Sequence, residues 1–151
     1  MDAQTAIARL VYAYAERIDE GDFEGVAELF AAGTITVEGT DAVRAGQDDV
    51  LEMYRQSTRI YEDTGTPKTK HVTTNVVIEV DEEAGTAQAR SYFTVLQATP
   101  ELPLQPVIAG RYRDRFERPE GTWRFAERHM ICDLFGDLSH HLLGRPAVPR
   151  Q

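Results

Sequence analysis

The chain has 151 residues, enough for one domain with a sizeable hydrophobic core. It carries 16 basic and 25 acidic residues, and the resulting formal charge of −9 repels phosphate backbones and anionic lipid surfaces. We therefore expect neither nucleic acid nor a membrane as a partner. No apolar run approaches the roughly 18 residues that a transmembrane helix needs, no charged-then-apolar leader precedes the first helix, and the single Cys132 allows no internal disulfide. These features predict a cytoplasmic protein.

The first half of the chain has the periodicity of helices. Between residues 2 and 18, apolar residues recur at spacings of three and four, which predicts an amphipathic helix with one buried stripe. Gly21 ends this helix, and Asp22 is a suitable N-cap for a second, shorter one. A short strand at 34–38, a polar loop at 39–46 and a third helix at 48–61 are expected to follow.

The second half is rich in β-branched and aromatic residues, and turns of hairpin length separate its runs. The four expected strands span residues 69–80, 86–98, 106–118 and 122–134. Helices followed by antiparallel strands indicate an α+β domain in which a strongly bent sheet wraps helices on its concave face. We expect one domain over residues 1–143 and a loosely ordered tail over 144–151, where two prolines lie close together.

Two polar residues at element boundaries are candidates for a catalytic pair. Asp19 lies near the end of the first helix, on the flank of its apolar face, and His71 opens the first long strand. From position alone, each is better explained as a polar residue in solvent. Strand alternation groups His71 with Thr73 and Asn75 on the more polar of the two strand faces. That face fits the wall of a wet pocket, and the aliphatic face then packs elsewhere.

The order of the elements and particular residues resemble the nuclear transport factor 2-like, or SnoaL-like, α+β cones, which include scytalone dehydratase, lindane dehydrochlorinase and bile acid 7α-dehydratase. The matching residues are Tyr14, Asp19, Gly21-Asp22-Phe23, Leu29-Phe30, His71, Asn75 and the run Gly121-Thr122-Trp123-Arg124-Phe125. The resemblance covers nearly the whole chain and implies a cone-shaped fold. In the dehydratase branch, an aspartate at the end of the first helix holds a histidine from the sheet. The resemblance therefore implies that Asp19 and His71 form such a dyad.

The dyad suits elimination of water or another leaving group beside a polarised carbon. Such a reaction needs a base that accepts a proton near neutral pH, and histidine fits that task, so His71 is the candidate base. Asp19 is expected to fix the imidazole tautomer and to stabilise the imidazolium. Tyr14 lies on the buried stripe, matches the tyrosine of the bile acid dehydratase branch and is the candidate acid or hydrogen-bond donor. The alternative for Tyr14 is a core aromatic residue with a satisfied hydroxyl.

Further polar residues are candidates for the wall of the substrate pocket. They are Tyr54, Tyr92, His129 and Asn75. In the last strand His129 shares the phase of Phe125 and Arg128 has the opposite phase, so one of the two is expected to face the pocket. His140 and His141 are adjacent in an expected loop, and no spacing resembles a metal-ligand set or a dinucleotide fingerprint. We expect no metal and no cofactor.

Three functions are compatible with these residues. The first is a cofactor-independent lyase, a dehydratase or dehydrohalogenase, that acts on a hydrophobic polycyclic or aromatic small molecule. The second is an isomerase or cyclase that uses the same base, with Glu38 as a possible second base. The third is a non-catalytic binding or scaffold cone in which Asp19 and His71 make a structural hydrogen bond. We also expect a homo-oligomer, a dimer before a trimer, because aliphatic rows on the exposed face of a bent sheet are seldom left in solvent.

Overall fold

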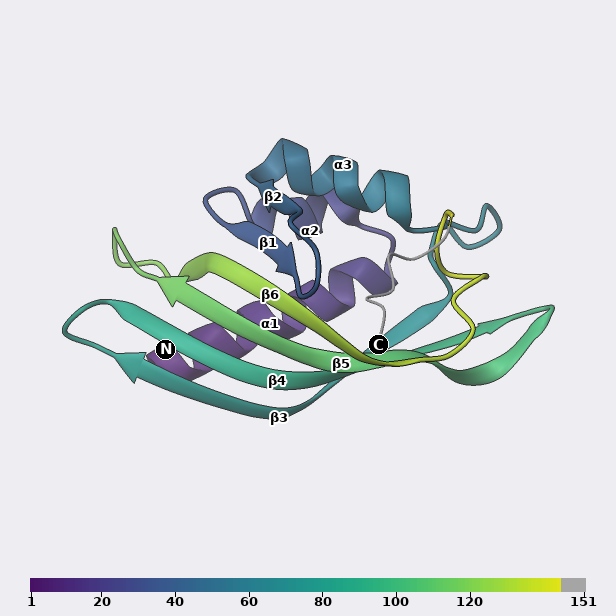
Figure 1. Ribbon diagram of the computed structural model, residues 1–151. Coiled ribbons are helices and arrows are strands. Elements are labelled where there is room, and N and C mark those ends of the chain that lie inside the picture. The colour runs from purple at the N-terminus through teal and green to yellow at the C-terminus, as the bar shows by residue number, and fades with distance from the viewer. Residues whose placement is uncertain (145–151) are drawn as a thin grey trace.

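The computed structural model describes residues 1–144, which form an α+β cone (Figure 1). The elements in chain order are α1 (Ala3–Asp19), α2 (Phe23–Leu29), β1 (Thr34–Val37), β2 (Val43–Ala45), α3 (Gln47–Ser57), β3 (Thr69–Asp81), β4 (Thr86–Thr99), β5 (Leu102–Glu117) and β6 (Arg124–Phe135). Within the described residues, no helix is long and apolar enough to cross a membrane. The expected loose tail lies, apart from its first residue, outside the described part of the chain.

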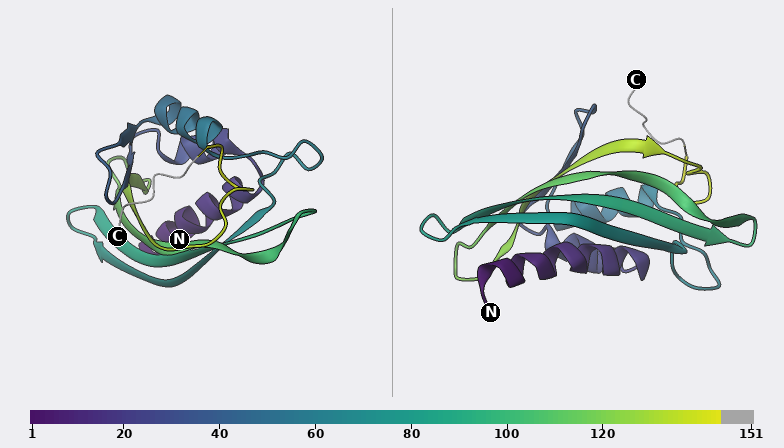
Figure 2. Two further views of the ribbon diagram at one scale, coloured as in Figure 1. Left: turned by 45° about the vertical axis from the view of Figure 1, so that its right-hand side comes forward. Right: turned by 90° about the horizontal axis from the view of Figure 1, so that it is seen from below.

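The sheet holds six strands in the order β2-β1-β6-β5-β4-β3. All neighbours are antiparallel except β1 and β6, which run parallel. The long strands curl around α1, and α2 and α3 lie across the other side of the fold (Figures 1 and 2). The predicted fold class, helices packed in the concave face of a bent and mainly antiparallel sheet, is confirmed.

The first helix is defined by signals at both of its ends. Asp2 caps it, because its carboxylate accepts a hydrogen bond of 2.7 Å from the backbone N–H of Thr5. Its apolar stripe buries Ile7, Val11, Tyr14 and Ile18. Gly21 adopts a φ of +75°, which favours glycine, and turns the chain out of the helix. Asp19 is thereby held at the last helical position, beside the start of β3.

Three element boundaries differ from those expected, because long-range pairing decides them. β2 forms inside the expected 39–46 loop by pairing with β1. α3 ends at Ser57, since Thr58 is extended and forms a bridge with Leu142. β5 begins at Leu102, which pairs with Thr99 across a tight turn, so the prolines that follow are accommodated in an irregular part of the ladder.

A bulge in β3 changes which side chains face the core. An extra residue at Asn75, whose φ is +55°, shifts the pairing between β3 and β4. His71 faces the helices before the bulge, and Ile78 and Val80 pack against the same core after it. Val77 is turned outward and is 40% exposed. The predicted alternation, which set Ile78 and Val80 on the face opposite His71, is wrong because one inserted residue reverses the phase.

A second bulge, in β6, decides between Arg128 and His129. The pairing of β5 with β6 shifts by one residue at Ala126, so Phe125 and Arg128 both point inward. Arg128 is completely buried, whereas His129 lies on the outer face. The prediction that His129 shares the inward phase of Phe125 is therefore wrong.

The position of Gly21 gives a test of how the end of α1 is fixed. A Cβ atom at Gly21 would overlap the carbonyl oxygen of Gly65, in addition to the strain of a positive φ. Gly121 also has a positive φ, but a Cβ atom there would meet nothing within 4 Å. We expect Gly21→Ala to lower the free energy of unfolding by at least about 3 kcal/mol and Gly121→Ala by about 1 kcal/mol. Urea denaturation measures both, and equal losses would contradict this account.

Candidate functional site

The carboxylate of Asp19 joins the end of α1 to the start of β3. Its Oδ2 accepts a hydrogen bond of 2.7 Å from the backbone N–H of His71, and its Oδ1 accepts one of 2.9 Å from the Thr69 hydroxyl. The same Oδ1 lies 2.7 Å from Nδ1 of His71. Both side chains are about nine-tenths buried, at 10% exposure for Asp19 and 8% for His71. The structure thus brings the two candidate residues into direct contact.

This contact defines the hydrogen positions on the imidazole of His71. An ionised carboxylate only accepts hydrogen bonds, so Nδ1 of His71 carries the hydrogen that faces Asp19. In the neutral imidazole, Nε2 then carries a free lone pair. Within residues 1–144, no group hydrogen-bonds to this Nε2, so the nitrogen that a base would use is unengaged.

Tyrosines border His71 on the interior side. The Tyr14 ring meets the His71 ring edge to face, with 6.5 Å between centroids. The Tyr14 hydroxyl is hydrogen-bonded to the hydroxyl of Tyr54, which comes from α3. Burial raises the pKa of Tyr14 and raises the pKa of Tyr54 and Tyr112 further, so all three phenols stay protonated near neutral pH. In a hydroxyl pair only one hydrogen lies between the oxygens, so the second hydrogen points outside the pair.

A buried guanidinium lies behind these tyrosines. Arg128 forms two hydrogen bonds of 2.9 Å with the Asp114 carboxylate, and both side chains are fully buried. Its Cζ lies 4.2 Å from the ring centroid of Tyr14 and 3.7 Å from that of Tyr112. Burial opposes the charge, but the Asp114 carboxylate more than offsets this effect and raises the pKa of Arg128. Nη1 of Arg128 is buried and has no hydrogen-bond partner within residues 1–144.

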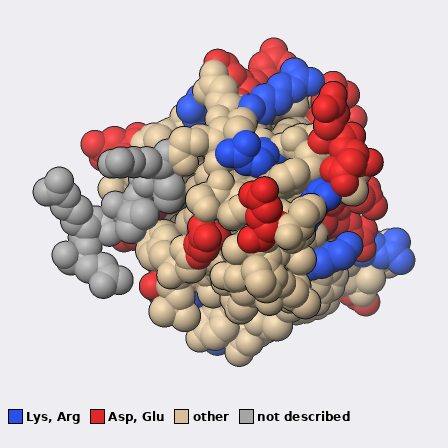
Figure 3. Space-filling model, turned by 90° about the vertical axis from the view of Figure 1, so that its right-hand side faces the viewer, with Lys and Arg blue, Asp and Glu red and all other residues tan. Residues whose placement is uncertain are grey.

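Sequence reasoning missed His141, which lies in the segment after β6. The residue is 7% exposed, and its ring centroid is 6.4 Å from that of His71. Burial first, and His71 second, lower the pKa of His141 to about 4. This segment lies at the end of the molecule that Figure 3 shows. At that end, acidic side chains gather along one edge, and the lower half has few charged groups. In the sequence, the only signal from this segment was the pair of adjacent histidines, His140 and His141.

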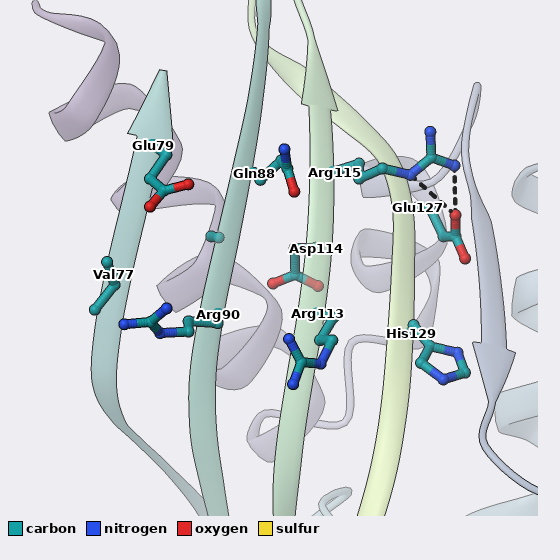
Figure 4. Close-up of a pocket in the computed structure, with 10 residues that line it drawn as sticks. Val77, Glu79, Gln88, Arg90, Arg113, Asp114, Arg115, Glu127 and His129 are labelled. Atoms are coloured by element: carbon teal, nitrogen blue, oxygen red, sulfur yellow. Dashed lines mark hydrogen bonds and ion pairs between the residues drawn. The ribbon is translucent and has the colours of Figure 1, made fainter. Parts of the chain in front are cut away.

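Three of the candidate pocket residues, and the candidate second base, lie on the outer face of the sheet instead. Tyr92 is 52% exposed, Asn75 is exposed at the β3 bulge, and His129 lines an outer hollow with side chains of β3, β4 and β5 (Figure 4). His129 is bound there by Thr36, at 2.7 Å, and by Glu38, at 2.6 Å. The predicted placement of these residues in the interior pocket is wrong, because the two bulges reverse the strand phase for Asn75 and His129, and Tyr92 follows the outward phase of β4.

The described part of the chain, residues 1–144, does not bring together groups that could bind a metal. Within residues 1–144, no three His, Cys, Asp or Glu side chains are arranged to hold an ion. Cys132 is partly buried, and burial raises the pKa of its thiol, so it is not disposed to act as a thiolate.

The arrangement agrees with a known family. A profile of the SnoaL-like domain matches residues 1–129. The chain belongs to the SnoaL-like family. The resemblance noted in the sequence is thereby confirmed, and no functionally curated protein matches the sequence significantly.

Solved structures of SnoaL-like and related cones share the fold. An Asp-to-Asn variant of Rv3472, a protein of unknown function from Mycobacterium tuberculosis, is 28% identical, with a TM-score of 0.69 over 86% of this chain and 71% of that chain. An NTF2-like protein with a cystatin-like fold from Novosphingobium aromaticivorans is 20% identical, with a TM-score of 0.70 over 85% and 80% of the two chains. A proposed scytalone dehydratase from the same organism is 24% identical, with a TM-score of 0.66 over 87% and 84%.

The buried imidazole of His141 predicts a particular pH dependence of stability. Its pKa of about 4 in the folded chain lies below the ordinary 6.5, so the unfolded chain binds more protons between these values. Stability therefore rises with pH from 4 to 6.5 and is lost as pH falls through this window. His141→Phe removes this contribution, and we expect the difference in unfolding free energy between wild type and variant to change by about 3 kcal/mol across the window. Urea melts at several pH values measure it, and parallel curves would contradict it.

Proposed function

We propose that this SnoaL-like domain is a cofactor-independent lyase of the dehydratase type, with His71 as the base. The observation that carries the proposal is the Asp19–His71 hydrogen bond of 2.7 Å, with Nε2 of His71 free of any partner in residues 1–144. A base needs such a nitrogen within reach of its substrate. The non-catalytic alternative, in which the pair only joins α1 to β3, does not require it, and the assay below distinguishes the two.

In the proposed reaction, Nε2 of His71 removes a proton from a carbon beside a polarised group. The electron pair of that bond forms a carbon–carbon double bond as the bond to the leaving group breaks, and a departing hydroxide takes the proton back from His71 and leaves as water. Asp19 stabilises the imidazolium that forms in between. The Tyr14–Tyr54 hydroxyl pair supplies a neutral donor to the oxygen that gains charge. Arg128 adds a fixed positive charge behind the Tyr14 ring, at 4.2 Å. The charges of Asp19 and Arg128 are in place before the substrate binds, so little reorganisation of the protein is needed during the reaction.

The side chains that surround the dyad favour a hydrophobic, ring-shaped substrate. Aromatic residues dominate around the dyad, and the buried tyrosines offer flat faces as well as hydroxyls. An isomerase or cyclase uses the same base and donor without a leaving group, and it is the second candidate. Glu38 is not part of that mechanism, because it lies on the outer face, bound to His129.

A general elimination substrate tests the proposal without knowledge of the natural one. 5-Nitrobenzisoxazole opens to a phenolate when a base removes its ring proton, and the product absorbs visible light. We expect acceleration by the wild-type protein and a loss of about 10²–10⁴-fold in kcat/KM for His71→Ala. Asp19→Asn should lose nearly as much, and the double variant hardly more, because Asp19 acts through His71.

The chain offers a matched control for this assay. His129 also contacts a carboxylate, that of Glu38, but on the outer face, so His129→Ala should retain the wild-type rate. Urea melts establish that each variant folds. Wild-type turnover in His71→Ala, or an equal loss in His129→Ala, would remove the mechanism.

We also propose that the domain forms a homodimer, with a homotrimer as the second candidate. The outer sheet face, expected to be aliphatic, instead combines exposed Tyr92 and Val77 with arginines. Within residues 1–144, neither Arg113 nor Glu79 of this face forms an ion pair. Both side chains line the hollow in Figure 4, so two copies related by a two-fold axis offer complementary charges.

Charge reversal tests the proposed dimer. Glu79→Arg and Arg113→Glu should each weaken it by about tenfold or more, because each places like charges together. The two changes in one chain should restore association, since a two-fold interface contains the pair twice. Sedimentation at micromolar concentration measures the outcome. A monomeric wild type, or no rescue in the double variant, would rule this interface out.

A further inference from the structure

The segment after β6 brings a second histidine to the dyad. The backbone of His141 is fixed on both sides: its carbonyl accepts a hydrogen bond of 2.8 Å from the N–H of Arg59, and its N–H donates one of 3.1 Å to Leu138. The neighbouring carbonyl of His140 accepts hydrogen bonds from Gln97, at 3.0 Å, and from the Tyr61 hydroxyl, at 2.5 Å. The backbone of this segment is therefore held in place by the fold, and it carries the imidazole of His141 to the dyad.

Two other rings that carry polar groups lie next to the His71 ring. Tyr14 meets it on one side at 6.5 Å, and His141 meets it at 6.4 Å with an angle of 66° between the ring planes. His141 remains uncharged near neutral pH because it is buried. The proposed mechanism does not use His141. Within residues 1–144, His141 is the one buried titratable side chain next to His71 that has no role in it.

The two nitrogens of His141 differ in their surroundings. Nδ1 is enclosed and has no hydrogen-bond partner within residues 1–144, whereas Nε2 is not enclosed in this way. An orphaned N–H in a dry site is costly and rare, while an unused acceptor is better tolerated. The favoured tautomer therefore has its lone pair on Nδ1 and its hydrogen on Nε2. This is the opposite of His71, whose hydrogen is on Nδ1.

We propose that His141 is a second catalytic residue, whose neutral Nε2–H donates a hydrogen bond to an oxygen of the substrate while His71 removes the adjacent proton. This inference rests on the proposed function and narrows it to substrates that carry a carbonyl group on the carbon next to the acidic one. The carbon–hydrogen bond breaks and its proton goes to Nε2 of His71. Its electron pair forms a double bond to the carbonyl carbon, and the π electrons of the carbonyl move onto the oxygen, which gives an enolate. His141 keeps its own proton throughout, as a neutral imidazole polariser does. A halogenated hydrocarbon without oxygen gains nothing from this donor.

2-Tetralone, a bicyclic ketone with acidic protons beside its carbonyl, is the probe. Proton exchange with D2O is followed by NMR for wild type, His141→Phe and His141→Gln. We expect His141→Phe to lose about 10²–10³-fold, mainly in kcat, and His141→Gln to retain most of the rate because its amide also donates. Equal losses in both variants, or less than a twofold loss in His141→Phe, would overturn the proposal.

A second measurement does not depend on turnover or on the folding of a variant. Histidine-¹⁵N NMR of the wild type should show the Nε2–H tautomer for His141 and a shift of that nitrogen when 2-tetralone binds. An Nδ1–H tautomer, or binding that shifts His71 but not His141, would overturn the proposal and leave the base intact. Exchange that survives in His71→Ala would refute the proposed function instead. Neither exchange nor any shift of the His141 signal would refute both.

Discussion

Three hydrogen bonds converge on the carboxylate of Asp19, and the relation between α1 and the sheet depends on them. A carboxylate at the last position of a helix is electrostatically unfavourable, because the partial charge at that end of the helix is negative. The N–H of His71, its imidazole and the Thr69 hydroxyl offset this cost. The same contacts fix the ring of His71 and leave its Nε2 unengaged. One residue thus connects two layers of the fold and orients the proposed base.

A second buried charge supports the view that the interior is organised for more than stability. Breaking an ion pair such as Asp114–Arg128 costs several kcal/mol, yet replacing both partners by apolar residues is often neutral or stabilising. A cone that served only as a scaffold has little need for a guanidinium beneath Tyr14 and Tyr112. A site in which negative charge develops has a clear use for it.

The parts of the fold that follow local rules were predictable from the sequence. The amphipathic period of α1 and the glycine after it define the helix face of Tyr14 and the position of Asp19, and the alternation of β4 was also predictable. The contact of Asp19 with His71 followed from a resemblance, since they are 52 residues apart in the sequence. Where the predicted alternation failed in β3 and in β6, one extra residue in each strand was responsible. The composition of β3 and β6 does not predict the bulges, because pairing with β4 and β5 decides where they form.

The same limit explains which functional candidates were missed. Arg128 is a buried charge in a strand, a placement that sequence patterns discourage and that only its pairing with Asp114 makes stable. His141 lies in an irregular segment, where no periodicity predicts which side chain turns inward. Tyr92 obeyed the alternation of its strand, but the sequence did not say which face of β4 is concave. Long-range contacts therefore decide the content of the site, and local patterns decide the elements that carry it.

The claim that Asp19 orients His71 as a base is tested most directly by histidine-¹⁵N NMR of the wild-type protein at neutral pH, which identifies the tautomer of His71. The account predicts that Nδ1 carries the hydrogen bound to Asp19 and that Nε2 has a free lone pair, with this preference lost in Asp19→Asn. An Nε2–H tautomer in the wild type would contradict the account, because the nitrogen that has to accept the proton would already hold one.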